Sequence, residues 1–303
     1  MDFDIEKHRI FECITGSRLY GTDTPKSDYD YRGVCIPPRK VLLDPFMGFD
    51  QKDKGFKEED RSIYNLAKFM RLCADGNPNI VELLFVPDKN IILSSKKWEE
   101  LISNREFFLS KKIRYTFSGY AFSQLEAIKR HRQWFLNPPT HKPTREEYGL
   151  TDKPKISFAL ITAMETLNKN ILKEEYVKEF NKEKEYRKQK ENWDHYSEWQ
   201  KNRNPERKSL EEKYGYDLKH ASHLFRLLYE GKELLLTGKI TFPLPEKEEI
   251  LAIKQKGIYS YDEVVEKAKE MDENFKLWYE ESSLTHSSNK KKLTELYFNL
   301  IDS

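Results

Sequence analysis

The chain has 303 residues, and at about 100–200 residues per domain this length favours two domains. Its 53 Lys and Arg residues nearly balance its 51 Asp and Glu residues, which excludes a histone-like polycation and an acidic tail protein. Charged residues make up 34% of the chain and aromatic residues 13%, so the composition excludes disorder and indicates a folded, soluble protein with a heavily charged surface.

The cysteines and the N-terminus indicate the compartment. Cys13, Cys35 and Cys73 do not have the spacing of a zinc site, and free thiols are typical of a reducing compartment. The acidic N-terminus lacks the apolar core of a signal peptide, and no apolar run approaches the roughly 20 residues that span a bilayer. The sequence therefore predicts a cytoplasmic protein with no membrane partner.

The first third of the chain shows mixed α and β signals. Short, mainly apolar runs predict strands over Ile10–Thr15 and Tyr29–Pro37, and residues 39–60 are expected to be loop or strand. Apolar residues from Ile63 to Cys73 recur with a period of 3.6 and predict a helix, and Gly76 is its expected C-terminal stop. Together these signals favour an α/β domain.

Beyond about residue 95 the strand signals nearly vanish. Helical patterns cover residues 97–104, 112–134, 155–186, 218–236 and 261–281, and Lys290-Lys291-Lys292 is expected to begin one more helix. The stretch 173–213 holds 12 basic and 11 acidic residues, which is typical of a solvated helical insertion. We therefore predict an α+β chain: a mixed domain over residues 1–110, then an all-helical domain over 111–303 with a charged insertion at 173–213.

The residues most informative about chemistry follow the first predicted strand. Gly16-Ser17 and Gly21 allow backbone geometry closed to other residues, and successive N–H groups in such a turn bind anions. Asp28 and Asp30 alternate with tyrosines at the start of the second strand, which puts both carboxylates on one face about 7 Å apart. Two such anions repel each other unless a divalent cation such as Mg²⁺ lies between them. A phosphate-binding turn beside a carboxylate pair is what phosphoryl or nucleotidyl transfer requires.

The segment GSRLYGTDTPKSDYDYRGV resembles the G-S…D-x-D signature of the DNA polymerase beta nucleotidyltransferase superfamily, most closely the RNA-repair-associated, RlaP-like nucleotidyltransferases. The likeness extends to Asn65–Phe85 and Tyr214–Pro245 and covers roughly half of the chain. It implies a polymerase-beta-like catalytic domain in the N-terminal part.

The resemblance also implies three carboxylates that hold two Mg²⁺ (or Mn²⁺) ions. Asp28 and Asp30 match the first two directly. Six acidic residues lie near enough to be the third: Asp44, Asp50, Asp53, Glu58, Glu59 and Asp60. We choose Asp60, because it precedes the helix from Asn65 to Cys73 at the spacing that the family pattern implies, with Glu59 and Asp53 as alternatives. Asp60 would otherwise be the N-cap of that helix.

Two groups of residues are expected to contact the nucleotide. The first group lies in the turn and loop before the second strand and comprises Gly16, Ser17, Arg18 and Ser27. The second group lies on the polar face of the helix over 218–236 and comprises Lys219, His220, His223 and Arg226. Leu227 falls within that polar face, which indicates that the face is partly buried and needs an anion. A surface role for Arg18 and a solvated face for the helix are the alternatives.

Two further features have both a structural and a functional interpretation. Lys129-Arg130-His131-Arg132-Gln133-Trp134 is a basic cluster beside an aromatic ring, which suits a single-stranded nucleic acid or the charged end of a helix. Glu82, after Asn77-Pro78, is expected to be buried and paired with an Arg or Lys.

The sequence thus predicts a Mg²⁺-dependent enzyme that moves a nucleoside monophosphate from an NTP to an acceptor hydroxyl on RNA or a tRNA end. Transfer to a protein or a small molecule is chemically equivalent, because any activated hydroxyl can attack the α-phosphate. A catalytically silent nucleotide- or RNA-binding protein of the same fold, and an accidental motif on a structural protein, are the remaining alternatives.

Overall fold

The computed structural model describes residues 3–44, 46, 48–56, 59–153 and 174–302. Two compact units make up the chain. The first comprises Met1–Ile128 and Leu218–Ser303, and the second comprises Lys129–Asp217. A domain boundary near residue 110 stays a prediction. All of the candidate site residues belong to the first unit.

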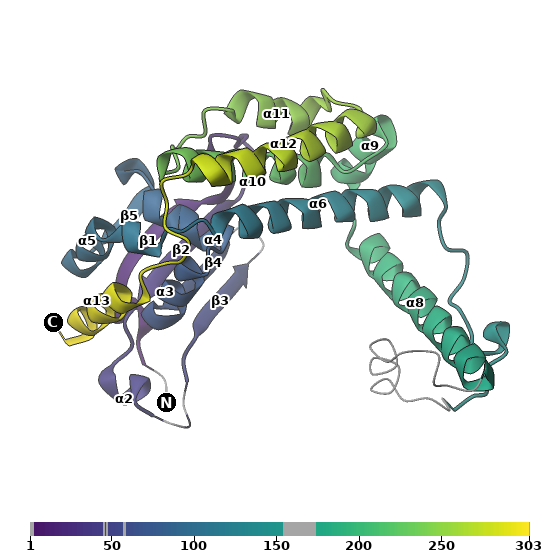
Figure 1. The fold of residues 1–303 in the computed structure, drawn as a ribbon, viewed down its shortest axis with the longest axis horizontal. Coiled ribbons are helices and arrows are strands. Elements are labelled where there is room, and N and C mark those ends of the chain that lie inside the picture. Colours follow the sequence, from purple (N-terminus) through teal and green to yellow (C-terminus); the bar gives the residue numbers. More distant parts are fainter. Residues whose placement is uncertain (1–2, 45, 47, 57–58, 154–173, 303) are drawn as a thin grey trace. The chain divides into compact units, whose positions relative to one another are not determined.

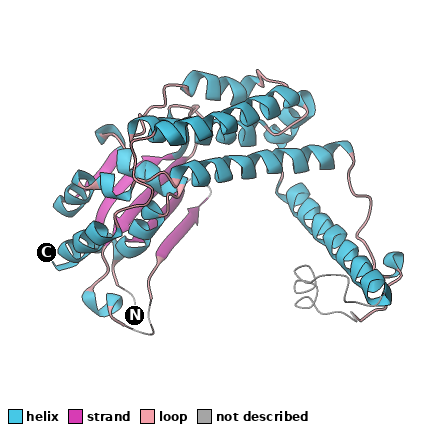
Figure 2. Cartoon of the chain, viewed as in Figure 1, coloured by secondary structure: helices cyan, strands magenta, loops and turns pink. Residues whose placement is uncertain are grey.

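A mixed five-stranded sheet lies at the centre of the first unit (Figures 1 and 2). Its strands are β1 (Arg9–Thr15), β2 (Tyr29–Cys35), β3 (Gln51–Phe56), β4 (Glu59–Asn65) and β5 (Ile91–Ser94). They are ordered β3-β4-β2-β1-β5; β2 and β4 are parallel and the other pairs are antiparallel. A mixed sheet followed by a helical region confirms the predicted α+β class, and β1 and β2 confirm the first two predicted strands.

The helix predicted to begin at Ile63 starts three residues later. Ile63 belongs to β4, and α3 (Leu66–Ala74) follows directly. The side chain of Asn65 accepts a hydrogen bond of 3.0 Å from the N–H of Ala67, so Asn65 is the N-cap. Asp60 lies within β4, and its interpretation as a helix cap is wrong.

Helices pack against the sheet and form a hydrophobic core with it. Phe11 of β1 stacks on Trp98 at 3.8 Å between ring centroids, and Phe69 of α3 packs on the same ring at 5.4 Å. The short helical elements of this part are η1 (Ile5–His8), α1 (Gly16–Tyr20), α2 (Arg39–Leu42), α4 (Pro78–Val81), η2 (Glu82–Phe85), η3 (Asp88–Asn90), α5 (Lys96–Ser103) and η4 (Arg105–Phe108).

The rest of the first unit is helical. It contains the first part of α6 (Ile113–Leu136), α10 (Leu218–Thr237), α11 (Lys247–Lys256), α12 (Tyr261–Glu281) and α13 (Lys290–Asp302). α10 packs against both α11 and α12 (Figure 1). A Cβ on Gly231 of α10 would lie 2.8 Å from the Phe275 ring, so this close approach requires glycine. The predicted helices over 112–134, 218–236 and 261–281, and the start at Lys290, are confirmed.

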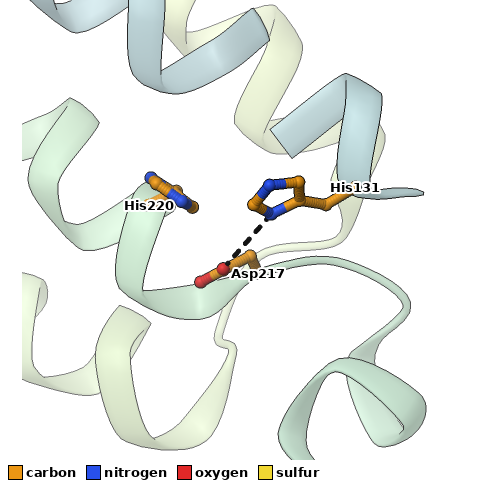
Figure 3. A group of neighbouring side chains, drawn as sticks. All are labelled: His131, Asp217 and His220. Atoms are coloured by element: carbon orange, nitrogen blue, oxygen red, sulfur yellow. Dashed lines mark ion pairs between the residues drawn. The ribbon is translucent and has the colours of Figure 1, made fainter. Parts of the chain in front are cut away.

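The second unit contains η5 (Glu146–Tyr148), α8 (Glu174–Asn202) and α9 (Pro205–Tyr214). Much of the helix predicted over 155–186 lies outside the described residues, but the charged stretch after 173 is helical as predicted. Trp134 is buried, and its indole N–H donates a 2.8 Å hydrogen bond to Asn192. His131 Nδ1 lies 3.6 Å from Asp217 Oδ2, an ion pair when the imidazole is protonated (Figure 3). These contacts favour a structural role for the basic cluster.

In the described part of the chain, no helix combines the length and the apolar character needed to cross a membrane.

Candidate active site

The turn between β1 and α1 brings the backbone against a carboxylate. Gly16 has a φ of 64°, in the left-handed region that favours glycine. A Cβ on Gly16 would lie 2.0 Å from Asp30 Oδ2 and 2.9 Å from Asp30 Cγ. Thr15 lies opposite Asp30 in the β1–β2 pair, and its hydroxyl donates to the Asp30 carbonyl at 3.3 Å. The predicted turn and the second carboxylate of the D-x-D pair therefore touch.

We expect Gly16→Ala to damage this contact. A side chain at a positive φ costs about 1–3 kcal/mol of stability, and displacement of Asp30 by about 1 Å costs about 10²-fold in any reaction that depends on its position. Urea unfolding and a nucleotidyl-transfer assay measure the two effects. Gly119→Ala is the matched control, because Gly119 has nothing within 4 Å of its Cβ position and lies in a helix. Equal behaviour of the two variants would contradict the assignment.

The strand register gathers the predicted carboxylates. In the parallel β2–β4 pair, Asp30 lies directly opposite Asp60, with the two Cα atoms about 4.8 Å apart as in any sheet. Asp28 precedes β2 by one residue and is exposed. Asp30 is half-buried between these two exposed carboxylates.

The pKa of Asp30 reflects this crowding. Burial raises it, and the negative charges of Asp60 and Asp28 raise it further, whereas Arg32 and Lys219 lower it. Mutual repulsion is what a divalent cation relieves, and carboxylate oxygens are the ligands that Mg²⁺ prefers. Carboxylates are the right type of donor for Mg²⁺, and binding of the ion by Asp28, Asp30 and Asp60 stays a prediction.

Arg32 is a site residue that the sequence reasoning missed. Its guanidinium lies 3.2 Å from Asp60 Oδ2 and donates to the Asp60 carbonyl at 3.3 Å. The run DYDYR carries the signal for it, because the same period of two that pairs Asp28 with Asp30 puts Arg32 on their face. Such a partly exposed ion pair contributes only about 0–1 kcal/mol, so a metal ion can displace Arg32 at little cost.

The two alternatives for the third carboxylate are Asp53, which lies on β3, and Glu59, whose side chain lies outside the described residues. Asp53 lies opposite Ser62 on β3, and its carboxylate accepts hydrogen bonds of 2.6 Å from both Ser62 and Gln51. These bonds lower its pKa. The Glu59 and Glu58 side chains lie outside the described residues. The register favours Asp60.

Arg18 and Ser27 shape the loop before β2. Arg18 donates to the carbonyls of Ser27 at 2.7 Å and Asp28 at 3.3 Å, and its guanidinium stacks 3.8 Å from the centroid of the Tyr29 ring. The Ser27 hydroxyl accepts from the Thr24 N–H at 2.9 Å. Both residues fix the loop that presents Asp28, and direct contact with a nucleotide stays a prediction for them. Ser17 lies in the first turn of α1, beside Gly16.

A cationic group faces the carboxylates from the helical region. Lys219 of α10 is exposed, and its charge lowers the pKa of Asp30. Lys254 of α11, which the sequence reasoning missed, donates to the Thr22 carbonyl at 3.3 Å. Burial and Lys219 lower the pKa of Lys254, whereas Asp23, Asp28 and Asp30 raise it. These charges act on the carboxylates within this unit, and the predicted pairing of an acidic cluster with a basic cluster on α10 stays a prediction.

The two histidines of α10 differ in their surroundings. Burial, together with the charges of Arg226 and Lys219, lowers the pKa of His223 to about 3, so its imidazole is neutral at pH 7. His220 Nδ1 forms a 2.7 Å hydrogen bond with Gln124 Oε1 of α6. A neutral imidazole hydrogen-bonds a ligand without adding charge.

Arg226 lies inside the protein. Its guanidinium contacts Glu230 at 2.9 Å and Glu82 at 3.3 Å and stacks 4.5 Å from the Tyr20 ring. Tyr20 also donates to Glu82 at 2.9 Å. The predicted burial and pairing of Glu82 is confirmed. The anion that the buried face of α10 requires is supplied by the protein itself, and a phosphate contact of Arg226 stays a prediction.

Part of the chain matches a known protein family. Residues 5–137 match the family described as RlaP, the RNA repair pathway DNA polymerase beta family. This part of the chain is similar to that family. The resemblance seen in the sequence is thereby confirmed, and the matched segment includes Gly16, Asp28, Asp30 and Asp60.

Two individual proteins are similar to the chain. An uncharacterized 38.9 kDa protein from the nrdC-mobD intergenic region of Enterobacteria phage T4 is 31% identical over 125 residues, which span 38% of this chain and 37% of that protein. A nucleotidyltransferase-like protein from Exiguobacterium sibiricum 255-15 is 10% identical with a TM-score of 0.25, over 96% of this chain and 74% of that chain. The T4 match covers little more than a third of its relative.

Proposed function

We propose that the protein is a Mg²⁺-dependent nucleotidyltransferase that moves a nucleoside monophosphate from an NTP to an acceptor hydroxyl. One observation carries the proposal. The β2–β4 register puts Asp60 opposite Asp30, and Asp30 follows Asp28 by two residues. Gly16 approaches the Asp30 carboxylate so closely that a Cβ would not fit. The match of residues 5–137 to a DNA polymerase beta family supports it.

The chain's own residues have distinct roles in this reaction. The acceptor hydroxyl loses its proton to solvent, its oxygen forms a bond to the α-phosphorus, the bond between the α-phosphorus and the bridging oxygen breaks, and pyrophosphate leaves with that electron pair. Asp28, Asp30 and Asp60 would hold the metal ions, which would supply positive charge to the phosphates and lower the pKa of the acceptor hydroxyl. Gly16 and Ser17 bind the β- and γ-phosphates, and Lys219 and Lys254 face their negative charge from the other side.

RNA or a tRNA end is the proposed acceptor. The description of the family as part of an RNA repair pathway supports a nucleic-acid acceptor over a small molecule. Mn²⁺ has the same preference for oxygen ligands and is expected to replace Mg²⁺.

The test is a transfer assay. The protein is incubated with each α-labelled NTP, with Mg²⁺ or Mn²⁺, and with RNA, tRNA and protein acceptors in turn. We expect label on RNA or tRNA, and none when EDTA removes the metal. Transfer that survives EDTA would contradict the metal-dependent reaction, and label on protein alone would contradict the proposed acceptor.

We expect Lys254→Met to weaken NTP binding. Loss of one positive charge beside the phosphates should raise KM for the NTP about tenfold, which corresponds to about 1.4 kcal/mol, with a smaller change in kcat. Lys256→Met on the same helix is the matched control, because Lys256 is exposed. Steady-state kinetics separate KM from kcat. A fall in kcat with unchanged KM would show that Lys254 does not bind substrate.

A further inference from the structure

A cavity in the first unit is lined by groups that suit an anion. It has a volume of about 260 Å³ and lies where the end of α3, the start of α6, the end of α12 and the start of α13 meet. None of its lining residues belongs to the candidate active site. Its volume is just below the roughly 300–1,000 Å³ of small-molecule pockets, which suits a compact group such as a phosphate.

The lining of this cavity is positively charged. Lys111, Lys112 and Lys290 line it, against a single carboxylate, Asp75. Lys112 uses that carboxylate, with Nζ 2.7 Å from Asp75 Oδ1. Lys111 lies 5.0 Å from the centroid of the Tyr279 ring, and within the described residues neither Lys111 nor Lys290 has an ion-pair partner. Two positive charges are therefore left for a ligand.

Two largely buried serines add hydrogen-bond donors to this charge. Ser110 is 2% exposed and Ser288 is 8% exposed, and both line the cavity. Among the described residues, neither hydroxyl has a hydrogen-bond partner, although the Ser110 carbonyl accepts from Ile113 and the Ser288 carbonyl accepts from Lys290. Because both residues line the cavity, their hydroxyls can donate hydrogen bonds to a ligand oxygen there.

Helix starts add to the attraction. α13 begins at Lys290, where Asn289 caps the helix by accepting from the Lys292 N–H at 3.1 Å. α6 begins at Ile113, directly after Lys111 and Lys112. Helix N-termini carry partial positive charge, so both backbone ends favour the same kind of ligand as the lysines.

An exposed aromatic ring stands at the edge of the cavity. Tyr115 lines it and is 66% exposed, and its ring packs edge-on against Tyr279 at 6.1 Å between centroids. Lysines that bind phosphate beside an exposed ring that stacks on a base are the combination by which proteins hold single-stranded nucleic acid.

We propose that this cavity binds the phosphate of a nucleotide unit. Lys111 and Lys290 supply the charge, Ser110 and Ser288 donate hydrogen bonds to phosphate oxygens, and the base stacks on Tyr115. The nucleotide unit is either a free nucleotide or part of a single strand, since both present the same phosphate and base. A strand held here serves as an acceptor anchor outside the active site; that role, but not the binding, rests on the proposed function.

Adjacent lysines provide a matched test. Lys290 lines the cavity and Lys291 does not, although both are exposed in the first turn of α13. Binding of a fluorescent ten-nucleotide oligo(A) and of AMP is measured by anisotropy and competition in EDTA. We expect Lys290→Glu to weaken binding about tenfold or more, Lys291→Glu to change it less than about twofold, and Tyr115→Ala to weaken it with no loss of folding.

Each outcome decides the proposal. Equal effects of Lys290→Glu and Lys291→Glu, or no effect of either, would overturn it, because binding would then reflect general surface charge or another site. Weakened binding of AMP and strand alike identifies a free-nucleotide site, and an effect on the strand alone identifies a strand site. Failure of the proposed function is distinguishable, because label transfer would then be absent in wild-type protein while EDTA-resistant binding still depended on Lys290.

Discussion

Asp30→Asn is expected to reduce nucleotidyl transfer by about 10³-fold and to leave the protein folded. A bound metal ion contributes several kcal/mol to transition-state stabilisation, and each 1.36 kcal/mol corresponds to a factor of ten in rate. Asp30 lies between the other two carboxylates of the cluster, so its loss affects both metal positions that it would share. Single-turnover transfer of an α-labelled NTP measures the effect.

The same substitution has a predictable effect on stability. Burial and the neighbouring anions raise the pKa of Asp30 above its ordinary value of 3.8, so the folded protein binds a proton more tightly there than the unfolded chain does. Its contribution to stability is therefore full below pH 3.8 and declines as the pH rises through the raised value. In metal-free buffer, Asp30→Asn should remove that decline and be at least as stable as wild type at pH 7.

Asp53→Asn is the matched control for Asp30→Asn. Asp53 is a carboxylate on β3 that accepts hydrogen bonds from Ser62 and Gln51 and lies opposite Ser62 instead of Asp30. It should retain transfer activity within a few-fold of wild type. Loss of activity in the Asp53 variant with retention in the Asp30 variant would mean that the metal site is built on a different set of carboxylates.

Arg226→Met is expected to be the most destabilising single substitution considered. It leaves Glu230 and Glu82, both fully buried, without their shared cation. Removal of one partner of a buried ion pair costs about 3–5 kcal/mol, because the remaining charge stays buried and unpaired. Urea unfolding at pH 7 measures the loss, and Lys232→Met, a cation on the partly exposed side of the same helix, should change stability by less than about 1 kcal/mol.

Neutralising Glu82 and Glu230 should restore the stability that Arg226→Met removes. Burial raises the pKa of both Glu82 and Glu230, so the cost of removing Arg226 should diminish at low pH, where both carboxyls are protonated. The triple variant Arg226→Met, Glu82→Gln, Glu230→Gln should recover much of the stability at pH 7. If Arg226→Met is as stable as wild type, the guanidinium is solvated and the phosphate contact predicted from the sequence regains support.

The local part of the site could be predicted from the sequence. Gly16 follows an apolar strand, and Asp28 and Asp30 alternate with tyrosines, so the turn and the shared face follow from short-range geometry. Lys219 could be placed on a polar helix face by the same kind of argument. That Lys219 lies near the carboxylates could be expected only from the resemblance to the nucleotidyltransferase family.

Long-range pairing could not be predicted. The β3–β4 hairpin lies in polar sequence, QKDKGF and EDRSIYN, whose alternation is too weak to separate a strand from a loop. The helix signal of α3 therefore extended back over Ile63, and the register that pairs Asp60 with Asp30 stayed hidden. Partners for Arg226 were equally hidden, because a helical pattern identifies a buried face but not Glu82, which lies 144 residues away.

The three carboxylates and the family match lie in the first half of the chain, whereas the folded unit that contains them extends to the C-terminal residues. The matched segment stops at residue 137, whereas the compact unit that surrounds Asp30 includes residues 218–303. The Leu244 N–H donates to the Tyr20 carbonyl at 3.1 Å, and Lys254 donates to the Thr22 carbonyl, so the turn after α1 is held from both α11 and the segment before it. The family match and the folded unit therefore have different boundaries in this chain. A transplant of the matched segment alone would carry the three carboxylates but leave behind the cation of Glu82 and the supports of the turn after α1.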